Sequence, residues 1–277
     1  LEGNAPFAAA GIRVNGQTVP VEWTGFTTFR IRVPLTSATN TLSLVGIRSD
    51  GSAIPGFSDS ITIRYTGLID QASDFVVINE INYDAVASGA SYIELFNRST
   101  ATSFDLSGYR LNGLGYTFPQ GSIMPPGGYW VLARDRVAFG LAYGASVPVF
   151  DVFTGSLDND GERVALVTGS ETNEVIISDV RYANSLPWPT NAAGLGSSLQ
   201  LIDASRGSWR VANWTATATN NANRVTPGRA NAGAQALAAF PPLWINEVLP
   251  QNPSGPRDNA GDRDPFVEIY NAGTNAV

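Results

Sequence analysis

Three amino acids are missing from this 277-residue chain: it has no histidine, no cysteine and no lysine, and all 17 basic residues are arginine. Without histidine there is no Ser-His-Asp arrangement and no histidine-ligated metal. Without cysteine there is no thiolate nucleophile and no disulfide. Without lysine there is no Schiff-base chemistry and no P-loop lysine. Among enzyme chemistries, paired-carboxylate glycoside hydrolysis passes this filter.

Charged residues are also scarce, at 15% of the chain, and the net charge is −7. A nucleic-acid-binding protein needs a basic face, and the sequence has no cluster of arginines. No apolar run approaches the roughly 20 residues of a membrane-spanning helix. We therefore expect no nucleic-acid partner and no membrane span. The opening residues, Leu1-Glu2-Gly3-Asn4, carry no targeting signal, as expected of a piece cut from a longer polypeptide.

Residues 1–67 alternate between apolar and polar residues with the period of two that is typical of half-buried strands. Phe29, Ile31 and Val33 fall on one face of such a strand, and arginines fall on the other. Asn15-Gly16 is a strong hairpin signal, because both turn positions need a positive φ. The pattern predicts a small antiparallel sandwich, and it resembles the Ig- or fibronectin-III-like modules of bacterial surface and secreted proteins.

Residues 75–232 form a second series of predicted strands with one predicted helix. The helix is expected near 135–143, with Asp135 as its N-cap and Gly144 at its end. The strands are expected around 76–82, 92–97, 106–111, 129–132, 163–167, 175–181 and 198–202.

The start of this second series recurs near the end of the chain. Ile-Asn-Glu-Ile at 78–81 and Tyr-Ile-Glu-Leu-Phe-Asn at 92–97 return as Ile-Asn-Glu-Val at 245–248 and Phe-Val-Glu-Ile-Tyr-Asn at 266–271. Two strands cannot close a sandwich. We therefore expect residues 243–277 to be the first two strands of a second, truncated copy of the central unit. They are expected either to pair as a hairpin that leans on the central unit or to be poorly ordered.

Seven motifs in a fixed order identify the central unit. They are Ile-Asn-Glu-Ile at 78–81, Tyr-Ile-Glu-Leu-Phe-Asn at 92–97, Leu-Ser-Gly-Tyr at 106–109, Pro-Pro-Gly-Gly-Tyr-Trp-Val-Leu at 125–132, Leu-Asp-Asn-Asp-Gly-Glu at 157–162, Gly-Leu-Gly-Ser-Ser-Leu at 194–199 and Thr-Pro-Gly-Arg-Ala-Asn at 226–231. This set resembles the lamin tail domain. The resemblance implies an Ig-type β-sandwich without catalytic residues. The fold class is then all-β: tandem antiparallel Ig-like sandwiches at 1–67 and 75–232, with a truncated lamin-tail-like repeat at 243–277.

The resemblance also implies a setting. Bacterial relatives lie in long exported proteins, beside other β modules or catalytic domains, and act as interaction or spacer units. We therefore expect an extracellular or cell-surface location, with other protein domains or cell-surface components as partners. Lamin tails of animal nuclei are also discussed as chromatin contacts, but the acidic balance of this chain argues against that role.

Asp158, Asp160 and Glu162 are the candidate metal ligands, since Ca²⁺ prefers clustered carboxylate and carbonyl oxygens. An EF-hand register with Gly161 at position six would place Val167 where a bidentate acid is required. The alternative is a hairpin turn in which Asp and Gly accept a positive φ. No other cofactor is expected.

Four glutamates recur at matched positions: Glu80, Glu94, Glu247 and Glu268. A carboxylate pair is conceivable within each copy, but glycoside hydrolysis also needs a cleft, which nothing in the sequence supplies. The ordinary alternative is a glutamate exposed on a face or edge of the sandwich.

Trp188, Trp209 and Trp214 are the candidate ligand-binding residues, because aromatic faces stack on sugars in binding modules. Core tryptophans are the alternative, and they would be buried and not coplanar. The leading functional hypothesis is a non-catalytic structural or protein-interaction segment of a larger secreted or cell-surface protein. The alternative is a carbohydrate-binding module, with a polysaccharide as partner and a catalytic domain elsewhere.

Overall fold

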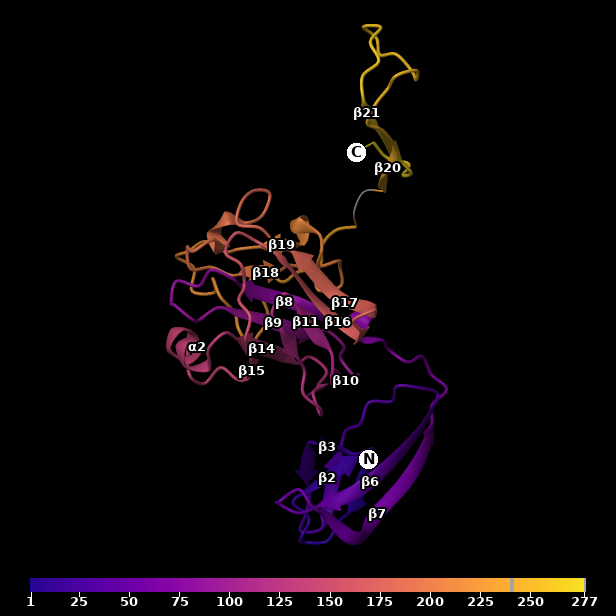
Figure 1. Ribbon diagram of the computed structural model, residues 1–277, viewed down its shortest axis with the longest axis vertical. Coiled ribbons are helices and arrows are strands. Elements are labelled where there is room, and N and C mark those ends of the chain that lie inside the picture. The colour runs from indigo at the N-terminus through magenta and orange to yellow at the C-terminus, as the bar shows by residue number, and fades with distance from the viewer. Residues whose placement is uncertain (240–241, 277) are drawn as a thin grey trace. The chain divides into compact units, whose positions relative to one another are not determined.

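The fold is known from a computed structural model that describes residues 1–239 and 242–276 (Figure 1). Strands hold 38% of the residues and helices hold 7%, so the predicted all-β class of antiparallel sheets is confirmed. The chain divides into two compact units, Leu1–Gln235 and Ala236–Val277. The boundaries 1–67 and 75–232 within the first unit stay a prediction, although the sheets of these two regions share no strand among the described residues.

The N-terminal region folds into two small sheets, one with the order β1-β5-β4 and one with the order β3-β2-β6-β7. Their strands are β1 (Glu2–Asn4), β2 (Gly11–Val14), β3 (Gln17–Val19), β4 (Val21–Trp23), β5 (Thr28–Ile31), β6 (Thr39–Ile47) and β7 (Ala53–Arg64). Phe29 and Ile31 are buried while Arg30 between them is exposed, as the alternation predicts. Asn15 and Gly16 join β2 to β3 with φ of 50° and 82°, as the hairpin signal requires.

The central region contains a six-stranded sheet, β15-β14-β9-β8-β18-β19, and a four-stranded sheet, β12-β11-β16-β17. A two-stranded sheet, β10-β13, completes it. The strands are β8 (Val76–Asn82), β9 (Tyr92–Asn97), β10 (Phe104–Asp105), β11 (Arg110–Asn112), β12 (Tyr116–Thr117), β13 (Ile123–Met124), β14 (Tyr129–Ala133), β15 (Val149–Val152), β16 (Arg163–Ser170), β17 (Asn173–Arg181), β18 (Leu199–Leu201) and β19 (Trp214–Thr215). The pairing of β14 with β15 is parallel, and the other pairings are antiparallel.

The main core of this region lies between its two larger sheets. Apolar residues of the strands pack in it, among them Ile78, Ile81, Ile93, Leu95 and Leu166. Each is fully or almost fully buried, and burying such a side chain stabilises the fold by about 1.5–3 kcal/mol.

The predicted helix is confirmed as α2 (Arg136–Tyr143). The Asp135 carboxylate caps it by accepting a hydrogen bond from Ala138 N at 2.8 Å, and Gly144 ends it with φ of 108°. Phe139 of this helix packs with Tyr92 and Val131, which lie on the face of the six-stranded sheet opposite the main core. Three shorter helices are α1 (Ala72–Phe75), η1 (Thr190–Ala192) and η2 (Val211–Asn213).

Strands β8 and β9 are therefore covered on both faces. All seven residues of β8 are buried, and so are five of the six residues of β9. A strand in this position usually has apolar residues on both faces. Here the second face carries polar side chains, which must find partners within the protein.

The second compact unit is a hairpin of β20 (Leu243–Leu249) and β21 (Phe266–Asn271). The predicted pairing of these two strands is confirmed. No helix in the described part of the chain is long and apolar enough to cross a membrane.

Candidate functional site

Glu80 and Glu94 are cross-strand partners in the middle of the six-stranded sheet, next to a register shift between Ile78 and Glu80. Both side chains are completely buried. The expectation of exposed glutamates is therefore wrong for this pair. The reason is the segment around residues 224–232, which donates hydrogen bonds to both carboxylates and closes this face of the sheet.

The Glu80 carboxylate is surrounded by donors. Its Oε1 accepts hydrogen bonds from the Tyr92 hydroxyl at 2.7 Å, from Thr226 N at 2.7 Å and from the Ser198 hydroxyl. Its Oε2 accepts one from the Thr226 hydroxyl at 3.0 Å. Thr226 is thus attached through its backbone and its side chain, 146 residues along the chain from its acceptor.

Glu94 accepts hydrogen bonds from Asn79 Nδ2 at 2.8 Å and from Gly228 N. Gly228 has φ of 79°, a conformation that other residues rarely adopt. A Cβ at this position would also lie 3.3 Å from Val147 Cγ1. A glycine is therefore required where the backbone turns toward the Glu94 carboxylate.

Asn231 completes the attachment. Its Nδ2 donates to the carbonyl oxygens of Asn79 at 2.9 Å and Leu201 at 2.8 Å. We refer to the whole set as the paired-glutamate network. Its members are Asn79, Glu80, Tyr92, Glu94, Ser198, Thr226, Gly228 and Asn231.

Burial controls the protonation of the two acids. Removal from water raises the pKa of Glu80, and its donors act in the opposite direction. The pKa of Glu94 is raised well above its usual range, first by burial and then by the negative charge of Glu80. Two carboxylates that face each other across neighbouring strands in a buried site do not both ionise easily. Burial and Glu80 also raise the pKa of the Tyr92 phenol.

This arrangement suits anchoring better than catalysis. A glycosidase pair flanks an open cleft in which the two carboxyl groups reach a sugar. Here both carboxyl groups are inaccessible to solvent and their oxygens bind the protein's own hydroxyl and amide groups. The two carboxylates bind the segment around residues 224–232 and hold it on the six-stranded sheet.

The loop of Asp158, Asp160 and Glu162 is closed by its own hydrogen bonds. Glu162 Oε1 accepts from Asp158 N at 2.9 Å, and Asp158 Oδ1 accepts from Asp160 N at 2.9 Å. Asp160 Oδ1 accepts from Asn184 Nδ2 at 3.0 Å, and Gly161 has φ of 115°. Over residues 1–239 and 242–276, no group of three acidic side chains is placed to hold a metal ion. The geometry is that of the turn alternative, and calcium binding gains no support from it.

The three candidate tryptophans do not form one surface. Trp188 and Trp214 are buried in the main core, with ring centroids 6.2 Å apart and planes inclined at 49°. Trp214 Nε1 also donates to Ser208 O at 2.7 Å. Trp209, in contrast, is 65% exposed. Its ring lies against Gly207, where a Cβ would approach ring atoms to 2.6 Å. The expectation that all three rings would be buried as core residues is therefore wrong for Trp209.

A surface depression of about 400 Å³ lies beside Trp209. Asp74, Arg98 and Asp179 line it together with the edge of β17. An exposed ring next to charged side chains is one arrangement that binds the faces and hydroxyls of a sugar. The sequence singled out Trp209, but the depression depends on strands that only the fold brings together.

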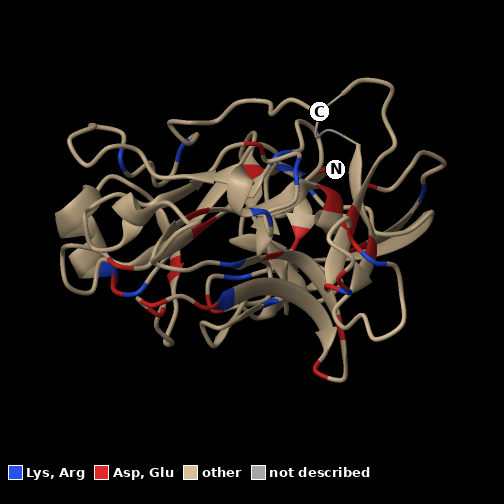
Figure 2. Cartoon of the chain, turned by 90° about the horizontal axis from the view of Figure 1, so that it is seen from above, with Lys and Arg blue, Asp and Glu red and all other residues tan. Residues whose placement is uncertain are grey.

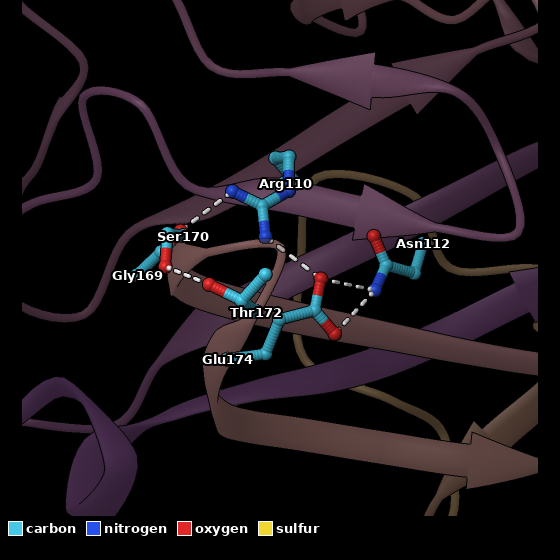
Figure 3. Close-up of polar contacts among 6 residues, drawn as sticks. All are labelled: Arg110, Asn112, Gly169, Ser170, Thr172 and Glu174. Atoms are coloured by element: carbon cyan, nitrogen blue, oxygen red, sulfur yellow. Dashed lines mark hydrogen bonds and ion pairs between the residues drawn. The ribbon is translucent and has the colours of Figure 1, made fainter.

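A second glutamate cluster, on the four-stranded sheet, shows the contrasting case (Figure 3). Glu174 of β17 lies 2.7 Å from Arg110 of β11 and accepts from Asn112 Nδ2 at 3.1 Å. The Arg110 hydrogen bond is the main reason why the pKa of Glu174 is lowered. Arginines elsewhere are also interspersed with acids along the chain (Figure 2), as in the pairs of Arg30 with Glu2 and of Arg163 with Asp179.

The central region, with its two packed and mainly antiparallel sheets, is an immunoglobulin-like β-sandwich. Residues 70–184 match the family model described as Lamin Tail Domain, which confirms the predicted resemblance for this part of the central region. The search of curated proteins and the search of solved structures each found no match.

Most of the paired-glutamate network was missed as a site when the sequence was considered alone. Thr226, Gly228 and Asn231 were recognised as a motif, but nothing in the sequence joined them to Glu80 and Glu94. The available signal was the apolar residue that directly follows each glutamate in both copies of the repeat: Ile81, Leu95, Val248 and Ile269.

Proposed function

We propose that this chain is a non-catalytic structural and protein-interaction segment of a larger secreted or cell-surface protein. The observation that supports this function best is the paired-glutamate network. The most enzyme-like pair of residues in the sequence is fully buried and is used to hold the Thr226–Asn231 segment on the sheet. An immunoglobulin-like lamin tail domain suits a structural or interaction role of this kind.

The non-catalytic role is tested by comparing stability and hydrolysis in the same variants. Glu80→Gln and Glu94→Gln should lower the free energy of unfolding, and the parent chain should release no product from a panel of chromogenic glycosides. Hydrolysis that Glu80→Gln abolishes without any loss of stability would contradict the proposal.

The location is tested in the organism that makes the protein. An antibody raised against residues 75–232 should detect the protein in the culture medium or on intact cells. Detection confined to the cytosol of lysed cells would exclude the secreted or cell-surface setting.

Carbohydrate binding is the second candidate, and the exposed Trp209 beside its depression is the observation in its favour. Retardation in gels that contain a soluble polysaccharide should then be lost in Trp209→Ala. Trp244→Ala is the matched control, because Trp244 is 64% exposed on a different unit. Equal retardation of all three proteins, or of none, removes this candidate.

A further inference from the structure

Trp209 is a large aromatic side chain that the fold holds outside the core. A Cβ added at Gly207 would lie 2.6–2.7 Å from three neighbouring atoms of the Trp209 ring, so the backbone of Gly207 packs on one face of the ring and not on its rim. The side chain as a whole is 65% exposed. The opposite face of the ring is therefore the part of Trp209 that meets solvent.

The loop that carries Trp209 is fixed in place by the residue before it. Ser208 is buried, and its hydroxyl donates a hydrogen bond to Asp179 O at 2.8 Å. The Ser208 carbonyl oxygen accepts a hydrogen bond from Trp214 Nε1 at 2.7 Å. A side chain on a loop that is already fixed loses little conformational entropy when a ligand binds, so this ring is ready for stacking.

Polar groups beside the ring are fixed as well. Arg98 lines the depression, with its guanidinium carbon 4.8 Å from the centre of the Phe75 ring and with a hydrogen bond from Nη2 to the Asp74 carbonyl oxygen. Asp179 lines it too, and its Oδ2 lies 2.9 Å from Arg163 Nε. The depression thus offers donors and acceptors at set positions beside an apolar face, which is the usual composition of a small-molecule site.

The charges around the depression balance. Asp74 and Asp179 are its acidic side chains, and Arg98 and Arg206 are its basic ones. A charged ligand would leave one charge without a partner in a site that partly excludes water, which weakens binding. An uncharged ligand with hydroxyl groups can donate to the carboxylates and accept from the guanidinium groups without this cost.

The site has room and stacking surface for little more than one sugar unit. Its volume of about 400 Å³ is at the small end of the range for ligand pockets. Trp209 is the one aromatic residue among the described residues that line it. Trp188 and Trp214, the other candidates for sugar stacking, are buried in the main core. A flat chain of sugars needs several exposed rings in a row, so the depression fits a single unit better.

We propose that the depression beside Trp209 binds one uncharged sugar unit of a glycan. The apolar face of the pyranose ring stacks on Trp209, and its hydroxyl groups bond to Arg98 and Asp74. The inference rests on carbohydrate binding, the second candidate function, and adds the charge of the ligand and the number of units that it presents. The structural and protein-interaction role does not depend on it, so the two can fail separately.

The test follows the NMR signals of the Trp209 indole N–H and of the backbone amides at 205–208 in the full chain. The probes are the methyl glycosides of glucose, galactose, mannose and N-acetylglucosamine, each paired with its uronic acid. We expect at least one uncharged glycoside to shift these signals with a dissociation constant of about 1 mM. Its uronic acid should bind more weakly. Its hexamer should bind less than about tenfold more tightly, because only one unit stacks.

Three substitutions test the parts of the site. Trp209→Ala should weaken binding by about tenfold or more, and so should Gly207→Ala, which keeps the tryptophan but forces its ring away from the loop. Arg98→Gln should weaken it several-fold. Arg32→Gln is the matched control, since it removes the same charge from an exposed position in the N-terminal region. Melting temperatures check that the variants are folded, and Trp209→Ala, at an exposed site, decides the case if Gly207→Ala is not.

The absence of any shift with every probe at about 50 mM would overturn the proposal. So would equal binding by the parent and Trp209→Ala, or equal effects of Arg98→Gln and Arg32→Gln. Stronger binding of the uronic acids, or an affinity that rises more than about tenfold from one unit to six, would overturn it as well. These last two results would keep carbohydrate binding as a candidate function, whereas the absence of both NMR shifts and gel retardation would remove both.

Discussion

Two glutamate pairs in this chain share one strand register and have opposite surroundings. Glu80 and Glu94 are completely buried under a segment that comes from more than 130 residues later in the chain. Glu247 and Glu268 stand on a bare two-stranded hairpin. The comparison teaches that the motif itself fixes the backbone geometry, including the register shift, while burial and the pKa changes come from the covering segment.

The largest expected effect separates the two pairs by their cover. Glu80→Ala should lower the free energy of unfolding by about 3 kcal/mol, because the buried donors Tyr92, Ser198 and Thr226 lose their acceptor. Glu247→Ala, at the same position of the exposed pair, should leave the main unfolding transition unchanged. Urea denaturation followed by tryptophan fluorescence measures both. If Glu80→Ala and Glu247→Ala lowered the free energy of unfolding equally, the covering segment would not be what makes the two pairs differ.

A smaller loss is expected where the covering segment turns. Gly228→Ala should cost about 1–2 kcal/mol for the positive φ, with a further loss from the contact with Val147. Gly108→Ala is the control, since Gly108 has a φ of 75° and nothing near its missing Cβ. If both variants lose the same stability, the close approach at Gly228 contributes nothing.

The third effect depends on pH. The pKa of Glu94 is raised in the folded chain, so its contribution to stability is complete below the unfolded pKa near 4.5 and is lost as pH rises through the folded value. Stability should therefore fall from pH 5 toward pH 8, by about 1.4 kcal/mol per unit of raised pKa. Asp50 and Glu174 have lowered pKa values, so the stability that they contribute is lost only in more acidic solution, as pH falls through their folded pKa values.

Glu94→Gln should flatten this fall, and Glu268→Gln should leave it unchanged. Urea midpoints at several pH values give the slopes. A slope that survives in Glu94→Gln would assign the pH dependence to other groups.

The smallest effect is expected at the accessible Glu174 cluster. Glu174→Gln keeps the shape of the side chain and loses only an ion pair with Arg110 that solvent partly screens. Its melting temperature should fall less than that of Glu80→Gln. The difference from the parent should also shrink at low pH, because the lowered pKa of Glu174 gives stability that is lost in acid. Calorimetric scans at two pH values measure both effects. Equal falls in melting temperature for Glu174→Gln and Glu80→Gln would mean that exposed and buried carboxylates contribute alike.

Local signals in the sequence predicted the local features of the fold. Asp135 and Gly144 delimit helix α2, and Asn15-Gly16 forms the turn between β2 and β3. The repeated motif near the end of the chain pairs as strands β20 and β21. The interpretation of Glu80 and Glu94 failed because their partners are distant in the sequence. A strand pattern reports which residues alternate, but it does not report that a polar face will be covered. Trp209 is the reverse case, because its aromatic ring lies against Gly207 and is exposed to solvent instead of packing in the core.

Amide hydrogen exchange at Thr226 and Gly228 tests most directly whether the paired glutamates hold the covering segment in place. The account predicts slow exchange of both amides in the parent chain. It also predicts much faster exchange in Glu80→Gln with Glu94→Gln, while amides within β16 stay protected. Rapid exchange of Thr226 and Gly228 in the parent chain, or protection that survives the loss of both carboxylates, would contradict it.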